Sequence, residues 1–243
     1  MSPLIVKTYA EASQVIEHLG ILPLSGSIPC HPSLDSITDP AAWHTGAGTD
    51  PWLWRDRFAS QGLAAYGRFL GTRPLLIAQD IFPLLKCLLA SPQTVKERYA
   101  AGLLARSSVQ IYEIIQQNHG IEVRMLRKLA AMQGKADKND FDRALIDLQH
   151  SADIVISGTA EKRNDQGNKS GWNGTCYMLA EQWMDKHGIT PSQLSPTDAK
   201  AQLFAWLQPR WDEHAVAYLH KKLARFPSGE GRNARSFKNP SPW

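Results

Sequence analysis

Apolar residues between positions 107 and 179 first follow the spacing of helices and then that of strands. Val109, Tyr112 and Ile115 recur at intervals of three and so share one helical face. Two more stretches with helical spacing follow, and then two strand-like runs on either side of a polar segment. The five stretches are 107–118, 123–130, 138–150, 152–158 and 172–179. Three short helices followed by a ribbon predict a winged helix-turn-helix over residues 107–179.

The part of the chain before this unit is predicted to be helical with one hairpin. Thr8 and Glu11 have the spacing of a capping box, so a helix is expected to begin there. Asp50-Pro51 is typical of a second helix start, with Asp as the cap and Pro in the first turn. The β-like stretches 63–70 and 74–78 predict a β-hairpin, and residues 21–48, rich in Pro, Gly and Ser, predict an ordered loop. Further helices are expected over 81–90 and from Ser91-Pro92 to about Ala105.

Short helices are also predicted after residue 180, and no internal repeat is evident. The expected fold is therefore mainly α with a small β part: a central winged helix-turn-helix, flanking helices and a β-hairpin. The predicted divisions are 1–106 (helical region with hairpin), 107–179 (winged helix-turn-helix), 180–226 (C-terminal helices) and 227–243 (basic tail).

Composition sets limits on the function. The chain of 243 residues has no apolar run of the roughly 20 residues that a membrane helix needs. Its start lacks the pattern of a secretion signal, so we expect a cytoplasmic protein. The three cysteines, Cys30, Cys87 and Cys176, form no CxxC pair, and the histidines show no ligand spacing. We therefore expect neither a metal nor a cofactor.

The net charge of +4 suggests a nucleic-acid partner, but most of the excess lies in the tail. Residues 107–179 carry nine basic and nine acidic side chains. In a DNA-binding winged helix the third helix, 138–150, would enter the groove, and its three Asp residues would repel phosphates. The predicted nucleic-acid contacts are Lys138, Arg143, Lys162, Arg163 and Lys169, helped by Arg225, Arg232, Arg235 and Lys238. The alternative is a protein-interaction module with a solvated charged face.

A second candidate site is the segment 43–57, which concentrates three tryptophans beside charged side chains. Aromatic walls with a few polar groups suit a planar ligand, including a nucleobase taken out of its stack. The predicted pocket residues are Trp43, His44, Trp52, Trp54, Arg55 and Tyr66, and the candidate catalytic residues are Asp50 and Asp56. Trp52 and Trp54 cannot share one helical face, so one is expected in the core. The alternative is that Asp50 is only a helix cap and the tryptophans are core residues.

The segment Asp50-Pro51-Trp52-Leu53-Trp54-Arg55, with Tyr66-Gly67-Arg68 downstream and the predicted winged helix beyond, resembles the AlkZ-related bacterial proteins. Through them the chain is distantly similar to the AlkZ-like winged-helix DNA glycosylases. This resemblance implies association with DNA and excision of damaged bases. The Gln-x-Gln motif of those glycosylases is missing, because Gln116 and Gln117 are adjacent, so no catalytic residue is transferred.

Three hypotheses follow. The first is a DNA-associated winged-helix protein linked to DNA repair. The second is a glycosylase-like enzyme that processes a base in the pocket of segment 43–57, with Asp50 or Asp56 as the charged group. The third is a protein-interaction module that binds no nucleic acid.

Overall fold

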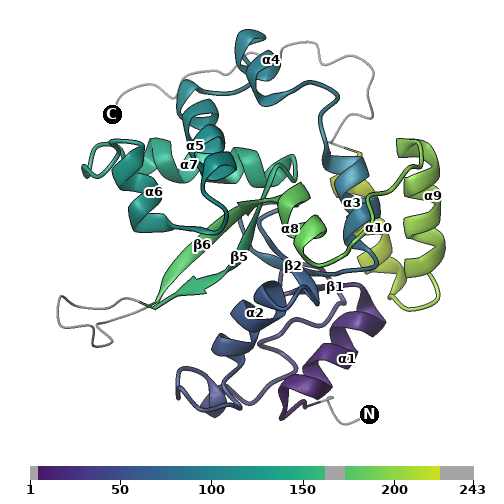
Figure 1. Ribbon diagram of the computed structural model, residues 1–243. Coiled ribbons are helices and arrows are strands. Elements are labelled where there is room, and N and C mark those ends of the chain that lie inside the picture. Colours follow the sequence, from purple (N-terminus) through teal and green to yellow (C-terminus); the bar gives the residue numbers. More distant parts are fainter. Residues whose placement is uncertain (1–4, 162–172, 225–243) are drawn as a thin grey trace, which may run out of the picture.

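A six-stranded antiparallel sheet runs through the centre of the computed structural model, which describes residues 5–161 and 173–224 (Figure 1). The strands follow the order β1-β3-β2-β5-β6-β4 across the sheet. Their bounds are β1 Ile21–Pro23, β2 Ala64–Gly67, β3 Leu75–Ala78, β4 Ile121–Glu122, β5 Ile154–Ala160 and β6 Gly174–Leu179.

Ten α-helices and one short 3-10 helix surround this sheet in the described part of the chain. In Figure 1, α1 and α2 lie below the sheet, α5 to α7 lie above it, and α9 lies at the right. The bounds are α1 Tyr9–Leu19, η1 Pro40–Ala42, α2 Pro51–Ser60, α3 Phe82–Leu89, α4 Val95–Ala100, α5 Arg106–Gln117, α6 Val123–Leu129, α7 Lys138–His150, α8 Ala180–Lys186, α9 Pro196–Leu207 and α10 Glu213–Leu223. No helix among these residues is long and apolar enough to cross a membrane.

The expectation of a mainly α chain with a small β part is corrected by the sheet. The predicted hairpin exists as β2 and β3, but β1 pairs with β3, and Tyr66 of β2 pairs with Ile156 of β5. Strands β1 and β4 have three and two residues, too few to show an alternating pattern. The fold is therefore mixed α and β. The elements expected over 107–179 occur in the predicted order, but their ribbon continues into the larger sheet.

The sheet is built from two units with the same order of elements, although the sequence shows no evident repeat. We call residues 9–78 the N-terminal unit and residues 106–179 the central unit. In each, a first helix is followed by a glycine of positive φ, Gly20 at 71° and Gly120 at 76°. The next residue, Ile21 or Ile121, begins a short strand that pairs with the last strand of its own unit. From either edge of the sheet inward, the strands follow the same order within their unit: the short strand, the last strand and then the first strand of the hairpin.

Local geometry extends this equivalence to the helix before each hairpin. Leu63 donates its backbone N–H to Phe58 O at 3.0 Å after α2, and Asp153 donates to Leu148 O at 2.9 Å after α7. Both connections pass through a residue of positive φ, Gly62 in one unit and Ala152 in the other. A shared backbone path of this kind needs few identical side chains, which explains why the sequence pattern does not reveal it.

Helix starts follow the predicted caps with one exception. The Thr8 capping box and Asp50-Pro51 begin helices as expected, and Ser195 caps α9 with Pro196 in its first turn. The helix expected at Ser91-Pro92 instead begins at Val95, because Thr94 and Glu97 form a complete capping box. A reciprocal pair of cap hydrogen bonds satisfies two exposed N–H groups, whereas Ser91 offers one acceptor.

Helix α2 is fixed by two contacts near its end. Phe58 is fully buried, and the Trp183 indole of α8 donates to Ala59 O at 2.8 Å. Gly158 of β5 lies against the next residue, where a Cβ would stand 3.2 Å from Ser60 Cβ. The lack of a side chain at Gly158 therefore allows α2 to approach the strand that belongs to the central unit.

Candidate functional site

Asp50 organises the loop that enters α2. Its two carboxylate oxygens accept backbone N–H groups of His44 at 3.0 Å, Gly46 at 2.9 Å and Trp52 at 2.9 Å. Burial acts to raise the pKa of Asp50, but these three donors outweigh it and hold the pKa below its ordinary value. The side chain is 1% exposed. Asp50 thus has the geometry of a structural anchor.

The tryptophans of this segment divide as their spacing predicts. Trp54 is 2% exposed, and its indole donates to Gly48 O at 2.8 Å, so it is a core residue rather than a wall of a pocket. Trp52 is half-buried, with its ring 4.7 Å from that of His44. Trp43 is also half-buried and donates to Thr38 Oγ1 at 2.9 Å. Of the predicted pocket, Trp52 and His44 lie together and Trp54 does not join them.

Arg55 links Trp52 to the acidic group that follows it in α2. Its guanidinium carbon lies 3.2 Å from the centroid of the Trp52 ring, a stacked cation–π arrangement. Its Nε lies 3.4 Å from Asp56 Oδ1, and both side chains are 15% exposed. The Arg55 Nε also donates to Trp52 O at 3.2 Å, and the Arg55 charge acts to lower the pKa of Tyr66 of β2. A single cation therefore contacts an aromatic ring and a carboxyl, and its charge acts on a neighbouring phenol.

The electrostatics of this group are unusual at Asp56. Burial raises the pKa of Asp56 to about 6, even though Arg55 acts to lower it. Burial likewise raises the pKa of Tyr66, while Arg55 lowers it and the charge of Asp56 raises it. A carboxyl whose pKa lies near neutrality and whose side chain retains access to solvent is typical of a group used in proton transfer or charge stabilisation.

The central unit adds residues that the sequence pattern could not associate with Asp56. Tyr66 and Tyr177 both lie opposite Ile156 in the sheet, so the three side chains occupy one face. Burial raises the pKa of Tyr177 to about 12, with Arg68 lowering it and Tyr66 raising it. We refer to Arg55, Asp56, Tyr66, Arg68 and Tyr177 as the Asp56 cluster. Its members come from α2, β6 and the β2 region.

The charged side chains of α6 and α7 form a second candidate surface. Lys138 and Arg143, both predicted to contact DNA, are exposed on α7. Lys138 Nζ lies 2.6 Å from Asp142 Oδ2, one turn further along the helix. Arg127 is half-buried, lies 5.0 Å over the Phe141 ring and donates to Met132 O, so it supports the turn between the two helices. The other predicted contacts, Lys162, Arg163, Lys169 and the tail cations, lie outside the described residues.

The Asp56 cluster holds no set of metal ligands among the described residues. Elsewhere in the described part of the chain, Cys30, Asp212 and His214 form one group of potential metal ligands.

Comparison with protein families places the chain in one of them. The family described as AlkZ related matches residues 6–224. This match covers nearly the whole chain, so the protein belongs to the AlkZ-related family. No curated protein and no solved structure matches it.

Proposed function

We propose that this chain is a DNA-associated protein linked to DNA repair, and that its central unit is a winged helix that contacts the duplex through α6 and α7. One observation carries the proposal: the surface of these helices is basic although the sequence of the unit is neutral. Between residues 123 and 150, the exposed acidic side chains are Asp140 and Asp142, and Asp142 is paired with Lys138. The exposed basic side chains are Arg124, Lys128, Lys135, Lys138 and Arg143.

Two of the carboxylates of α7 repel phosphates less than unpaired, fully solvated groups would. Asp142 is paired with Lys138 on the surface, and burial raises the pKa of the half-buried Asp147. The repulsion that three aspartates would exert on phosphates is therefore smaller than their number suggests. A surface with excess cations is the electrostatic requirement for binding duplex DNA.

The arrangement of elements supports the winged-helix part of the proposal. Helix, short strand, two helices and hairpin follow each other, and the short strand β4 pairs with the far strand of the hairpin, β6. In such units the third helix enters the major groove, which assigns that role to α7. Membership of the AlkZ-related family is consistent with DNA as the partner. Lys162, Arg163 and Lys169 would then add backbone contacts.

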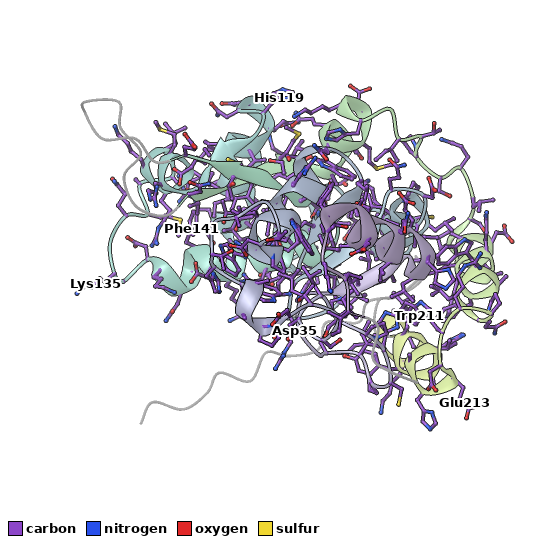
Figure 2. The ribbon with its side chains drawn as sticks, turned by 90° about the horizontal axis from the view of Figure 1, so that it is seen from below. Asp35, His119, Lys135, Phe141, Trp211 and Glu213 are labelled. Carbon is purple, nitrogen blue, oxygen red and sulfur yellow. The ribbon has the colours of Figure 1, made fainter. Side chains whose placement is uncertain are left out.

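The test is fluorescence anisotropy of a labelled duplex at two salt concentrations. The test variant is Lys128→Glu with Lys135→Glu, and the control is Lys7→Glu with Lys221→Glu, which has the same change in charge. All four lysines are exposed. Figure 2 shows Lys135 at the opposite end of the molecule from Glu213 of α10, the helix that carries Lys221. A third variant replaces Arg225, Arg232, Arg235 and Lys238 with Gln.

We expect the test variant to bind at least ~10-fold more weakly than the control and to have a salt slope smaller by roughly one or two units. Equal losses in the test and control variants would refute a contact at α6 and α7. Loss of binding in the tail variant alone would show that the tail, and not α6 and α7, contacts the DNA. Co-purification with a protein partner and no binding to DNA at low salt would favour the interaction module.

A second function is favoured by the Asp56 cluster: hydrolytic removal of a damaged base. Breaking the bond between C1′ of the sugar and the base nitrogen leaves the electron pair on the base and positive charge on the sugar. The Asp56 carboxylate would stabilise that charge, and water would complete the hydrolysis at C1′. Trp52, stacked under Arg55, would supply an aromatic surface for the extruded base. Asp50 would act by positioning α2, since its oxygens already accept backbone hydrogen bonds.

A strand-cleavage assay on duplexes with damaged bases tests this second function. Asp56→Asn should abolish base release while binding to the same duplex stays within about twofold. Asp185→Asn, on the exposed surface of α8, is the control and should retain full activity. Base release that persists in Asp56→Asn would remove this residue from the reaction. No release from any lesion tested would leave DNA association as the function.

A further inference from the structure

We propose that Cys30, Asp212 and His214 form a binding site for a thiophilic divalent ion, with Zn²⁺ as the favoured occupant. The sulfur, carboxylate and imidazole donors of these three exposed residues lie within 4.8 Å of one another. They come from segments separated by about 180 residues in the sequence. A bound ion would therefore tie the start of α10 to the loop that follows β1. This site is independent of the proposed DNA contacts.

Buried contacts next to the ligands hold the two segments together. The ring of His31 lies 4.1 Å from that of Trp211, and His31 Nε2 lies 2.8 Å from Ile21 O. Trp211 is 7% exposed, and its indole donates to Leu19 O at 2.8 Å. Cys30 and Asp212 each adjoin one of these fixed rings. The two segments are thus in place before any ion binds, which lowers the entropic cost of forming the site.

The two donors at the helix start are hydrogen-bonded to each other, and a shared ion would replace that bond after a shift of a few tenths of an ångström. His214 Nδ1 lies 3.0 Å from Asp212 Oδ1. In a tetrahedral zinc site, bond lengths of about 2.0 to 2.3 Å place neighbouring donors roughly 3.3 to 3.6 Å apart. Asp212 also caps α10 by accepting the His214 N–H at 2.8 Å, so its carboxylate is oriented by the helix. A carboxylate has enough lone pairs to cap a helix and bind an ion together.

The donor set selects the kind of ion. A thiolate and an imidazole favour Zn²⁺, Co²⁺ or Cu²⁺, whereas Mg²⁺ and Ca²⁺ prefer oxygen ligands throughout. Three protein ligands leave the fourth tetrahedral position to water. On binding, the Cys30 thiol gives its proton to solvent and its sulfur forms the bond to the metal.

The ion should stabilise the folded chain, because the unfolded chain does not bring these residues together. Figure 2 shows Trp211 and Glu213, which flank Asp212, at the opposite end of the molecule from Lys135. The effect of the ion on stability should therefore be separable from DNA binding at α6 and α7.

The experiment is a Co²⁺ titration of the full chain after removal of metals and reduction of thiols. The readouts are the thiolate-to-cobalt charge-transfer band in the near ultraviolet and the visible bands of tetrahedral Co²⁺. The variants are Cys30→Ser and His214→Ala, and the control is Cys87→Ser, which removes the half-buried thiol of α3. Thermal unfolding with and without Zn²⁺ is measured on each protein.

We expect one equivalent of Co²⁺ to give both sets of bands in the wild type and in Cys87→Ser, and Zn²⁺ to displace it. Cys30→Ser should lose the charge-transfer band, and His214→Ala should bind at least ~10-fold more weakly. Zn²⁺ should raise the melting temperature of the wild type but not of Cys30→Ser. Absence of the charge-transfer band in the wild type, or its survival in Cys30→Ser, would overturn the site.

Discussion

Tyr66 and Ile156 lie directly opposite each other where β2 of the N-terminal unit pairs with β5 of the central unit. Each occupies the same position in its own unit, the third residue of its strand. The sheet therefore joins the units at their equivalent strands. On one side of this junction the charges of Arg55 and Asp56 act on the pKa of Tyr66, and Tyr177 lies on the other side of Ile156. The Asp56 cluster is thus a product of the pairing between units.

The raised pKa of Asp56 predicts a specific dependence of stability on pH. The folded-state pKa of about 6 exceeds the ordinary value of 3.8, so between these pH values the folded protein binds more protons than the unfolded chain. The free energy of unfolding should therefore decrease as pH rises from about 4 to about 6 because of this residue, by roughly 1 to 3 kcal/mol. Asp56→Asn should remove that decrease and be the more stable protein at pH 7.

Urea unfolding of wild type and Asp56→Asn at pH 4, 5, 6 and 7 measures this effect. The difference between the two proteins should grow with pH across this window. A constant difference would mean that Asp56 has an ordinary pKa and would weaken its proposed role.

Asp50→Ala should destabilise the protein by roughly 1 to 3 kcal/mol, because it removes the cap of α2 and leaves the N–H groups of His44 and Gly46 without an acceptor. Asp39→Ala is a matched control: Asp39 also caps a helix, the exposed η1, through one bond to the Ala41 N–H. Its cost should stay below about 1 kcal/mol. Thermal unfolding compares the two, and equal costs would show that the loop before α2 is not held by Asp50.

Gly158→Ala should loosen the contact between α2 and β5. The new Cβ would lie 3.2 Å from Ser60 Cβ, at a φ of +133° that residues with side chains rarely adopt. We expect a loss of about 1 to 3 kcal/mol in the free energy of unfolding. Gly48→Ala, where a Cβ meets nothing within 4 Å, should change stability by less than about 0.5 kcal/mol. Hydrogen exchange should show faster opening of α2 in the first variant, and unchanged exchange there would contradict the close approach.

The ion pair between Arg98 of α4 and Asp153 should be costly to break. Arg98 is 3% exposed and donates to both Asp153 oxygens at 2.8 Å and to Ser151 Oγ at 2.8 Å. Arg98→Ala leaves the carboxyl poorly solvated, and the expected cost is roughly 3 to 5 kcal/mol. The exposed pair Lys96–Glu113, with Nζ and Oε1 3.0 Å apart, is the control, and Lys96→Ala should cost less than about 1 kcal/mol. Similar values from urea unfolding would show that Arg98 is effectively solvated.

Local sequence predicted the elements whose formation depends on neighbouring residues. The Thr8 capping box, Asp50-Pro51 and the helical spacing of Val109, Tyr112 and Ile115 correctly indicated α1, α2 and α5. The spacing of Trp52 and Trp54 correctly indicated that only one would be a core residue. These features depend on hydrogen bonds and contacts within about one helical turn, which a sequence pattern records directly.

The assembly of the Asp56 cluster was decided by the tertiary structure. Nothing in the spacing of Asp56, Tyr66 and Tyr177 indicates that they share one region, because the positions of β2, β5 and β6 depend on pairing between strands far apart in the chain. The same holds for Cys30 with His214, and for the burial that raises the pKa of Asp56. The sequence by itself determined which segments become helices and which candidate side chains are available. Only the folded chain decided which of them meet and how far water is excluded from them, since both depend on contacts between distant segments.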